Sequence, residues 1–320
     1  MENLKCLILD DYQNVAFKTA DWSKLNHRVT ISSLQYHFEN QDQLVSQLAN
    51  ADILVVMRER TPLSKEILIQ LPKLKLIITS GMRNASIDMQ AAALQNIVVC
   101  GTSSSSEPPT ELTWALLLNL ARQIRVENEN LRNGKHWQST VGFDLHGKQL
   151  GILGLGKIGT KVAKIAKAFG MNISAWSQNL KKETTDALGV TLAASKEELL
   201  RTSDFLSIHL ILSERTRNLI GTDELRLMKP NAFLINTSRG AIINEEALIE
   251  ALNEKWIAGA GLDVFEVEPL PPQHPFRKLD NLLATPHLGY VSQTNYNVYF
   301  GEAIEDIDAF LNGNPIRTLN

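Results

Sequence analysis

The sequence predicts an α/β protein with two doubly wound parallel sheets, and three observations support this fold class. Short apolar runs that resemble buried strands alternate with segments of helical spacing along most of the chain. Alternation of this kind is typical of parallel sheets that helices cover on both faces. It stops near residue 101 and restarts at Gln149. A length of 320 residues is enough for two such domains.

The first series of elements lies before residue 101. Strands are predicted where apolar residues run together, at 4–9, 29–34, 52–57, 74–78 and 97–100. Helices are predicted where apolar residues recur at helical spacing, at 43–49, 64–71 and 87–94. The series therefore predicts one parallel sheet with covering helices.

Residues 101–109 read Gly-Thr-Ser-Ser-Ser-Ser-Glu-Pro-Pro and mark an abrupt change of composition. Such a segment can be a flexible linker. However, a long apolar helix is predicted to begin at Thr110 and to run to Ala121, too close for a free linker. We therefore expect a hinge that leads into a connecting helix.

The second series begins with an apolar run at 150–153, followed by glycines and a helix that closes at Gly170. Further strands are predicted at 173–176, 205–210, 232–236, 259–264 and 281–284, with helices at 196–200, 222–228 and 245–252. The final amphipathic helix, 293–311, is long enough to return to the first domain. The prediction is a domain of residues 102–289 inserted into a discontinuous domain of residues 1–101 and 290–320.

The composition is that of an ordinary globular protein, with 44% hydrophobic residues, 21% charged residues and a formal net charge of -3. Because basic residues are scattered, neither a nucleic-acid nor a membrane surface is expected. No apolar run approaches the ~20 residues that span a bilayer, and the N-terminus does not resemble a signal peptide. A cytoplasmic protein is therefore expected. Cys6 and Cys100 lie in strand-like runs and should be buried, and no Cys/His spacing predicts a metal site.

A strand, then Gly154-Leu-Gly156-Lys-Ile-Gly159, then a helix is the order that a dinucleotide site requires. Gly154 allows a tight turn, Gly156 lets the pyrophosphate approach the backbone, and Gly159 lets the helix pack closely on the sheet. The pyrophosphate would lie on free N–H groups at the start of the helix. The sequence therefore predicts a nicotinamide or other dinucleotide cofactor.

The end of the next strand bears on the choice between NAD and NADP. An NAD site usually has Asp or Glu here to bind the ribose hydroxyls, whereas this chain has Ser177, Gln178 and Asn179, followed by Lys181 and Lys182. No carboxylate is present to repel a 2′-phosphate, and these side chains could bind one. The arginine of strong NADP sites is missing from the turn. We expect NADP preference or use of both cofactors.

Three polar residues, Arg239, Glu268 and His287, follow successive predicted strands of the second series. A guanidinium can bind a carboxylate with two parallel hydrogen bonds. Histidine is well suited to transfer the hydroxyl proton near neutral pH, and a carboxylate on its other nitrogen fixes the tautomer. Singly, Arg239 could be a surface ion-pair residue and His287 a turn residue. Together and in this order, they predict oxidoreductase chemistry on a small 2-keto or 2-hydroxy acid.

The chain resembles the D-isomer-specific 2-hydroxyacid dehydrogenase family, which includes D-3-phosphoglycerate, glyoxylate/hydroxypyruvate and D-lactate dehydrogenases. The resemblance is most specific at residues 150–159, 236–248, 261–269 and 286–289. It implies a Rossmann cofactor domain inserted into a flavodoxin-like substrate domain, with homodimerisation through the cofactor domain.

The resemblance also implies roles for individual residues. Arg239 would bind the substrate carboxylate and carbonyl, His287 would be the acid/base, and Glu268 its partner. Asp263 is expected near the nicotinamide amide. The other residues implied to lie beside the cofactor are Gly154, Gly156, Lys157, Ile158, Leu210, Thr237 and Ser238.

The chain departs from the family pattern in the first domain. The family loop G-x-G-x-D-N-x-D offers N–H groups to the substrate carboxylate, and here Gly81 and Met82 are expected to do so. Arg83 replaces the second glycine, and Ala85-Ser86 replaces Asp-Asn. Arg83 either adds a cation that favours a dianionic or phosphorylated substrate, or points outward or toward Asp88. The family's H-x-P segment is His209-Leu210-Ile211 here, without the proline.

Two other functions remain open from the sequence. A non-catalytic regulator that senses NAD(P) would keep the fold, although it would not need the paired Glu268 and His287. An oxidoreductase of the phosphite or formate type is a more remote alternative. The particular 2-hydroxy acid does not follow from the sequence.

Overall fold

A computed structural model describes residues 3–38 and 40–320 of the chain. The chain divides into two compact units, one of Met1–Ser105 with Val291–Asn320 and the other of Ser106–Tyr290. The predicted segment 1–101 includes residues 1, 2 and 39, which lie outside the described residues. Residues 102–105 fall in the first unit because the N–H of Thr102 donates to Thr79 O (3.0 Å) and the N–H of Ser105 to Asn295 Oδ1 (2.8 Å).

The first unit holds a five-stranded sheet in the order β2-β1-β3-β4-β5, with every neighbouring pair parallel. This is the flavodoxin-like order. β3 and β4 are apolar without alternation because both their faces are covered. The strands are β1 (Leu4–Ile8), β2 (Val29–Ser33), β3 (Ile53–Val56), β4 (Leu76–Thr79) and β5 (Val98–Gly101).

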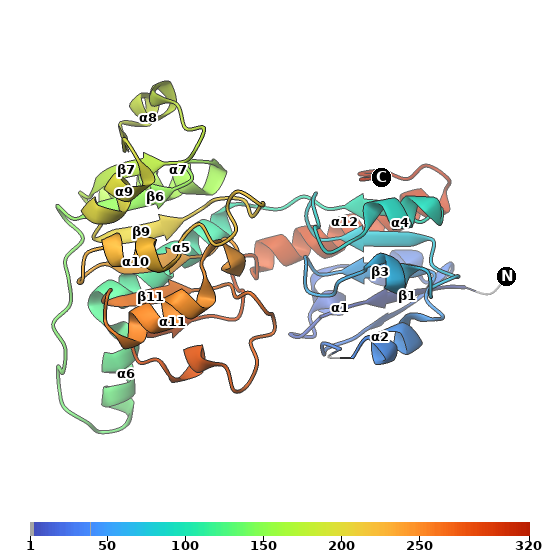
Figure 1. Cartoon of the computed structure of the whole chain (residues 1–320). Helices are drawn as coiled ribbons and strands as arrows, with labels where there is room; N and C mark the ends of the chain where they lie inside the picture. The colour runs from blue at the N-terminus through green and yellow to red at the C-terminus, as the bar shows by residue number, and fades with distance from the viewer. Residues whose placement is uncertain (1–2, 39) are drawn as a thin grey trace. The chain divides into compact units, whose positions relative to one another are not determined.

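Helices pack on this sheet in two groups (Figure 1). α2 (Gln41–Leu48), α3 (Lys65–Leu68) and α4 (Met89–Leu94) share one apolar core with alternate residues of the strands. α12 (Gln293–Leu311) packs against β4 and against α1 (Ala16–Thr19). The Trp22 ring, in the 3-10 helix η1 (Trp22–Leu25), lies 6.2 Å from the Phe300 ring of α12. The C-terminal helix therefore belongs to the core of the first unit.

The second unit holds a seven-stranded parallel sheet in the order β12-β11-β10-β9-β6-β7-β8. The strand order reverses between β6 and β9, which is the position where dinucleotides bind in Rossmann folds. The strands are β6 (Gln149–Leu153), β7 (Asn172–Trp176), β8 (Thr191–Leu192), β9 (Phe205–Ile208), β10 (Phe233–Asn236), β11 (Gly259–Leu262) and β12 (Leu282–Ala284).

Two apolar cores cover the two faces of this sheet. α5 (Glu107–Arg122) and α7 (Lys157–Ala168) share one core, and α9 (Lys196–Thr202), α10 (Thr222–Leu227) and α11 (Glu245–Asn253) share the other. The remaining elements are α6 (Ile124–Arg132), α8 (Lys182–Leu188) and the 3-10 helices η2 (Gly240–Ile242) and η3 (Pro275–Lys278). Both units are thus three-layered α/β structures, as predicted.

Three predicted boundaries near the site were wrong. α5 begins at Glu107 rather than Thr110, because prolines fit the first turn of a helix, where no N–H donor is needed. β9 ends at Ile208 and β11 at Leu262, so Leu210 and Asp263 lie beyond their strands. Both residues therefore lie at the carboxyl edge of the sheet.

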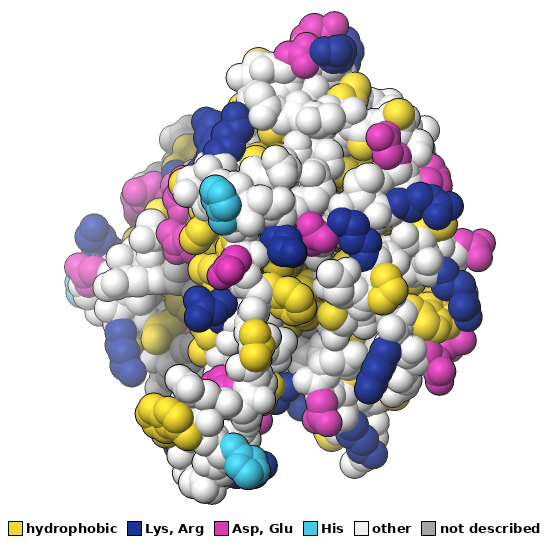
Figure 2. All heavy atoms as spheres, turned by 90° about the vertical axis from the view of Figure 1, so that its left-hand side faces the viewer, with side chains coloured by type: hydrophobic (Ala, Val, Ile, Leu, Met, Phe, Trp, Pro, Cys, Tyr) yellow, Lys and Arg dark blue, Asp and Glu magenta, His cyan; other side chains and the backbone are white. Residues whose placement is uncertain are grey.

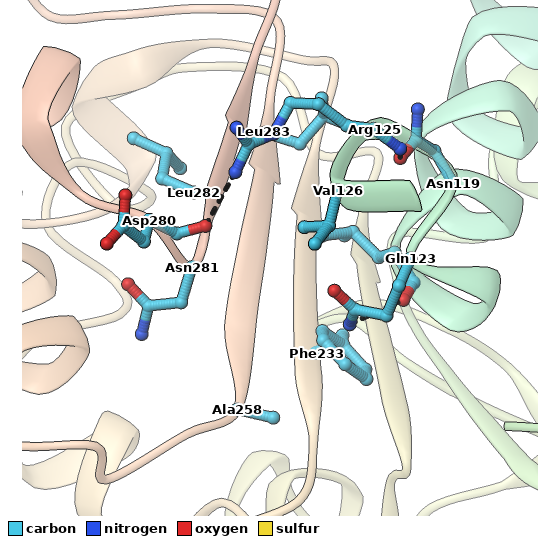
Figure 3. A pocket seen from close by; sticks show the side chains of 11 residues that line it. Asn119, Gln123, Arg125, Val126, Phe233, Ala258, Asp280, Asn281, Leu282 and Leu283 are labelled. Atoms are coloured by element: carbon cyan, nitrogen blue, oxygen red, sulfur yellow. Dashed lines mark hydrogen bonds between the residues drawn. The ribbon is translucent and has the colours of Figure 1, made fainter. Parts of the chain in front are cut away.

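A cavity of about 210 Å³ lies at the opposite edge of the same sheet (Figure 3). Phe233 and Leu282, where β10 and β12 begin, line it together with Gln123 and Arg125 from the α5–α6 junction. The Arg125 guanidinium donates to Asp280 O at 2.7 Å. This cavity is separate from the strand ends that carry the predicted site residues.

The surface of the second unit carries charges of both signs. On the face drawn in Figure 2, acidic and basic side chains are interspersed among hydrophobic and uncharged ones. Among the described residues, no helix is both long enough and apolar enough to span a membrane.

Candidate active site

The glycine turn between β6 and α7 has a geometry that only glycine satisfies at two positions. Gly154 has a φ of +97°, and its N–H donates to Trp176 O at 3.0 Å. A Cβ on Gly159 would lie 2.2 Å from Gly154 O, so α7 approaches the turn at backbone distance. The close packing of helix on strand predicted from the sequence is therefore present.

Gly156 differs from these two glycines because space is open beside it. A Cβ at this position would meet no atom within 4 Å. Gly156 is also the N-cap of α7 and provides no side-chain cap, so the first N–H groups of the helix, from Lys157 and Ile158, have no partner within the helix. Open space beside unpaired N–H groups at the positive end of a helix fits the pyrophosphate of a dinucleotide.

The turn after β7 carries polar but no acidic side chains. Ser177, Gln178 and Asn179 follow Trp176, and the N–H of Leu180 closes the turn on Ser177 O at 3.0 Å. Lys182 is paired with Asp186 within α8, at 2.7 Å, whereas Lys181 is the N-cap residue of that helix. Lys181 is therefore the lysine of the two that does not belong to this ion pair.

The ends of β9 and β10 are joined by hydrogen bonds. The Ser238 hydroxyl donates to Leu210 O, and the Thr237 and Thr113 hydroxyls are 2.8 Å apart. Fully buried Asn236 donates to Arg239 O (2.9 Å) and accepts from the Ser238 N–H (3.0 Å). Asn236 therefore shapes the turn that carries Arg239, a role not predicted from the sequence.

His209 is a half-buried residue just after β9, and its ring Nδ1 is shielded from solvent. Its Nε2 lies 2.8 Å from Ser207 Oγ. Burial lowers the pKa of His209 to about 4, because a charged ring would lose its hydration. The ring is therefore neutral near pH 7. The sequence analysis named the segment His209-Leu210-Ile211 but predicted no role for the His209 side chain.

Arg239 is half-buried and has an extended backbone, with a φ of -145°. One guanidinium nitrogen donates to Ser238 O at 2.7 Å. A Cβ on Gly240 would lie 2.1 Å from the Phe265 carbonyl carbon, so this turn packs against the segment after β11 at a distance that only glycine allows. Arg239 is thereby held beside the loop that contains Glu268.

His287 and Glu268 form a direct pair, with His287 Nδ1 2.6 Å from Glu268 Oε2. The side chains retain 19% and 26% exposure, so the pair is accessible but shielded. The other carboxylate oxygen, Oε1, accepts from the Phe265 N–H at 2.9 Å. The Tyr290 ring meets the imidazole edge-on, with centroids 5.3 Å apart. Nδ1 is thus committed to Glu268, which leaves Nε2 as the atom for proton transfer.

The family resemblance implied that Asp263 lies near the nicotinamide amide; in the structure its carboxylate also bonds to the loop that carries His287. Asp263 is fully buried and accepts from Thr285 Oγ1 (2.6 Å), Leu288 N (2.7 Å) and Gly289 N (2.8 Å). Burial raises the pKa of Asp263, while these donors and the nearby imidazole oppose that rise.

The first unit carries the predicted substrate loop after β4. Gly81 has a φ of +92°, and its N–H donates to Thr102 Oγ1 at 3.0 Å, in a buried position. This N–H is therefore engaged within the unit rather than presented to a ligand, contrary to the expectation from the sequence. Met82 and Arg83 are exposed. A Cβ on Gly81 would collide with the Arg58 guanidinium, so Arg58 lies against this loop although the sequence did not single it out.

The structure thus gathers Arg239, Glu268 and His287 at the carboxyl edge of one sheet, together with the glycine turn after β6. Within residues 3–38 and 40–320, no group of three His, Cys, Asp or Glu side chains could hold a metal ion. Chemically, this arrangement could bind an anion at Arg239, transfer a proton at His287 and accept a pyrophosphate at the start of α7.

Comparison with known proteins identifies related chains. Residues 114–289 match the family model described as "D-isomer specific 2-hydroxyacid dehydrogenase, NAD binding domain". The glyoxylate reductase of Aeropyrum pernix is 41% identical over 283 residues, which cover 85% of this chain and 83% of that protein.

The D-3-phosphoglycerate dehydrogenase of Methanocaldococcus jannaschii is 40% identical over 252 residues, which cover 78% of this chain but 48% of that longer protein. Among solved structures, a phosphoglycerate oxidoreductase from Vibrio cholerae O395 has a TM-score of 0.92 and 34% identity, covering 97% of this chain and 99% of that one.

Proposed function

The chain belongs to the D-isomer specific 2-hydroxyacid dehydrogenase family, and we propose that it interconverts a small 2-keto acid and the corresponding 2-hydroxy acid with NAD(P)(H). The observation that carries the proposal is the 2.6 Å contact between His287 Nδ1 and Glu268 Oε2, at the same sheet edge as Arg239. A protein that only sensed the cofactor would have no use for an oriented proton carrier.

The proposed chemistry assigns one task to each residue. The Arg239 guanidinium binds the substrate carboxylate and polarises the adjacent carbonyl. In the reducing direction, His287 donates the Nε2 proton to the carbonyl oxygen, and in the oxidising direction it accepts the hydroxyl proton. Glu268 stabilises the imidazolium and fixes the tautomer. When bound, the nicotinamide ring supplies or accepts the hydride.

The proposal assigns the cofactor to the second unit and part of the substrate contact to the first. The cofactor contacts proposed here come from Gly154, Gly156, Lys157, Ile158, Ser177, Gln178, Asn179, Leu210, Thr237 and Ser238. In the first unit, Met82 and Arg83 follow β4 and are exposed. An arginine in this loop favours a substrate with a second anionic group, such as a phosphorylated 2-keto acid.

For the cofactor, we propose NADP preference or use of both NADP and NAD. The support is the acid-free turn Ser177–Asn179, with Lys181 at the following N-cap. The test compares kcat/KM for NADPH and NADH in the wild type and in Ser177→Asp. The new carboxylate should repel the 2′-phosphate and lower the NADPH/NADH ratio by about tenfold or more. A wild type with a large NADH preference would refute the proposal.

We further propose a homodimer formed through the second unit. Its segment 124–141 carries four large apolar side chains with high exposure: Ile124 (51%), Leu131 (62%), Trp137 (79%) and Val141 (93%). So many exposed apolar side chains on one segment are typical of an interaction surface. Light scattering should give twice the chain mass for the wild type. It should give the mass of a single chain for the double variant Trp137→Ser, Val141→Ser.

We also propose that the protein acts in the cytoplasm, where its two buried free thiols, Cys6 and Cys100, remain reduced.

The experiment that tests the function is a panel of 2-keto acids with both reduced cofactors, followed by nicotinamide absorbance. The panel contains glyoxylate, hydroxypyruvate, phosphohydroxypyruvate and larger 2-keto acids. Oxidation of NAD(P)H with at least one of these acids is expected. Binding of NAD(P)H without turnover across the panel would instead support a cofactor-sensing regulator.

A further inference from the structure

Asp263 is a buried carboxylate that the proposed chemistry leaves without a task. It is the first residue after β11, and its N–H donates to Asn236 O on β10 at 3.0 Å. The residue is 0% exposed, so the surrounding atoms enclose its side chain completely. Burial of a carboxylate is costly unless hydrogen bonds compensate for the lost water.

The compensating hydrogen bonds all come from the loop that carries His287. Asp263 Oδ1 accepts from the Thr285 hydroxyl (2.6 Å) and the Leu288 N–H (2.7 Å), and Oδ2 accepts from the Gly289 N–H (2.8 Å). Backbone N–H groups can only donate, so the side chain facing them must present acceptors on both oxygens. An ionised carboxylate does this, whereas an amide does not.

His287 lies between these donors and has an unusual backbone conformation. Its φ is +52°, in the left-handed region that residues with a Cβ rarely adopt. Such a conformation persists when the surrounding structure determines it. Here Thr285 before His287 and Leu288 and Gly289 after it donate to one carboxylate. Gly289 allows the approach, because a Cβ there would lie 3.0 Å from Asp263 Oδ2.

We infer that Asp263 is a positioning residue, whose carboxylate holds the turn at His287 so that Nδ1 meets Glu268 and Nε2 is presented for proton transfer. The inference rests on the proposed function only in taking His287 as the proton carrier. It is an alternative to the cofactor contact that the family resemblance implied for Asp263. It also explains why two carboxylates lie near one imidazole: Glu268 bonds to the ring, and Asp263 bonds to the backbone beneath it.

The test compares Asp263→Asn with Asp204→Asn as a matched control. Asp204 also accepts from a backbone N–H, that of Gln149 at 2.9 Å, but it lies at the other edge of the sheet. Asp263→Asn places an amide N–H₂ against a backbone donor and should shift the turn. We expect kcat to fall about a hundredfold, as for a misplaced catalytic group. KM for the keto acid and the Kd of NAD(P)H should change less than about threefold, because Arg239 and the glycine turn are untouched.

A second measurement does not depend on turnover. In ¹⁵N-histidine-labelled protein, the Nδ1 proton of His287 bonded to Glu268 should give a downfield resonance, assigned by its loss in His287→Gln. The resonance should broaden or disappear in Asp263→Asn and persist in Asp204→Asn. If Asp263→Asn does not fold, Thr285→Val can be used instead, because it removes one of the three donors to Asp263. It should broaden the same resonance and lower kcat, both by less than is expected for Asp263→Asn.

The outcomes separate the two proposals. If Asp263→Asn keeps kcat and the resonance but raises the Kd of NAD(P)H tenfold, Asp263 contacts the cofactor and the inference is wrong. If the wild type turns over no 2-keto acid, the proposed function fails, while the resonance still decides whether Asp263 orders the His287 turn.

Discussion

The imidazoles of His287 and His209 lie in the same unit but are placed for different tasks. His287 retains 19% exposure and has a carboxylate on Nδ1. The Nδ1 atom of His209 is buried, its Nε2 faces Ser207, and the loss of hydration lowers the pKa of His209 to about 4. A group that must exchange protons needs access and a charged partner, whereas a neutral ring can serve as an uncharged packing and hydrogen-bonding group. The surroundings, rather than the residue type, therefore separate the two roles.

His209 predicts an acid sensitivity of the fold. In the unfolded chain a histidine titrates near pH 6.5, so below that pH the unfolded state binds a proton that the folded state resists until about pH 4. The free energy of unfolding should therefore fall as the pH drops from 6.5 toward 4, by up to about 3 kcal/mol from this residue. Urea unfolding of His209→Gln across this range should show a shallower decline than the wild type. The exposed His136→Gln is the control, and equal slopes for wild type and His209→Gln would contradict the assignment.

The sequence predicted the principal site residues because their chemistry is carried by side-chain type and position after a strand. Arg239 and Glu268 follow the buried strands β10 and β11, and His287 follows the partly exposed strand β12; parallel strands bring such positions to one edge. The hydrogen bonds of Asp263 and Asn236 were not predicted, because most of their partners are backbone groups of nearby loops. Every residue except proline carries the same backbone N–H group, so the sequence does not show which of these groups will donate to a given side chain.

At the scale of elements, the β6–α7 turn contains glycines that are needed for two different reasons, close backbone packing and open space for a ligand. Gly159→Ala places a methyl group 2.2 Å from Gly154 O, which is backbone and cannot move cheaply. Gly156→Ala meets nothing within 4 Å and has an ordinary φ of -82°. Gly159 is therefore needed for the fold, and Gly156 for the approach of a ligand.

This difference gives a prediction for a matched pair of variants. Gly159→Ala should lower both the free energy of unfolding, by about 1–3 kcal/mol, and the affinity for NAD(P)H. Gly156→Ala should leave the free energy of unfolding within about 0.5 kcal/mol and raise the Kd of NAD(P)H at least tenfold. Urea unfolding and fluorescence titration measure the two quantities. Unchanged cofactor affinity in Gly156→Ala would show that the pyrophosphate does not bind over this glycine.

Three of the elements that the sequence did not predict have little core to reveal them. α6 has no buried residue, β8 has two residues, and α8 buries only Thr185. Hydrophobic periodicity predicts an element only when one face is buried. By contrast, α12 buries a face along its length, and its observed bounds Gln293–Leu311 are those predicted.

At the scale of the whole molecule, the C-terminal segment completes the first unit in a way that the sequence did not predict. Thr318 forms an antiparallel bridge with Cys100, and the Leu319 N–H donates to Val99 O at 2.7 Å. Arg317 anchors the segment on α12, donating to Asp306 Oδ1 (2.9 Å) and Glu305 Oε2 (2.9 Å). Asp306 is 0% exposed, and burial raises its pKa to about 7.

Arg317→Ala should destabilise the first unit by about 1–3 kcal/mol near neutral pH, because the hydrogen bonds from the guanidinium to Asp306 and Glu305 are lost, while Asp306 avoids a buried charge by keeping its proton. The loss should grow as the pH rises above about 7, because the wild-type folded state releases the Asp306 proton there, whereas the variant, without the cation, retains it to a higher pH. Arg28→Ala is the control, since its pair with Asp308 is exposed on both sides (39% and 55%) and contributes about 0–1 kcal/mol.

Each unit has its own apolar core, so calorimetry can assign the loss. Arg317→Ala should lower the unfolding temperature of the first unit. NAD(P)H should raise the unfolding temperature of the second unit, because it binds only when that unit is folded. A loss no larger than that of Arg28→Ala would mean that Asp306 finds another partner or stays protonated at no cost.

The most direct test of the central claim is the turnover of a 2-keto acid by His287→Gln, measured together with the Kd of NAD(P)H. A glutamine side chain keeps polarity at this position but cannot carry the transferred proton. Removal of a general acid predicts a fall in kcat of about 10²–10⁴-fold, with cofactor affinity within about twofold of the wild type. A kcat equal to that of the wild type would contradict the assignment of His287 as the proton carrier, and with it the account of Glu268 and Asp263.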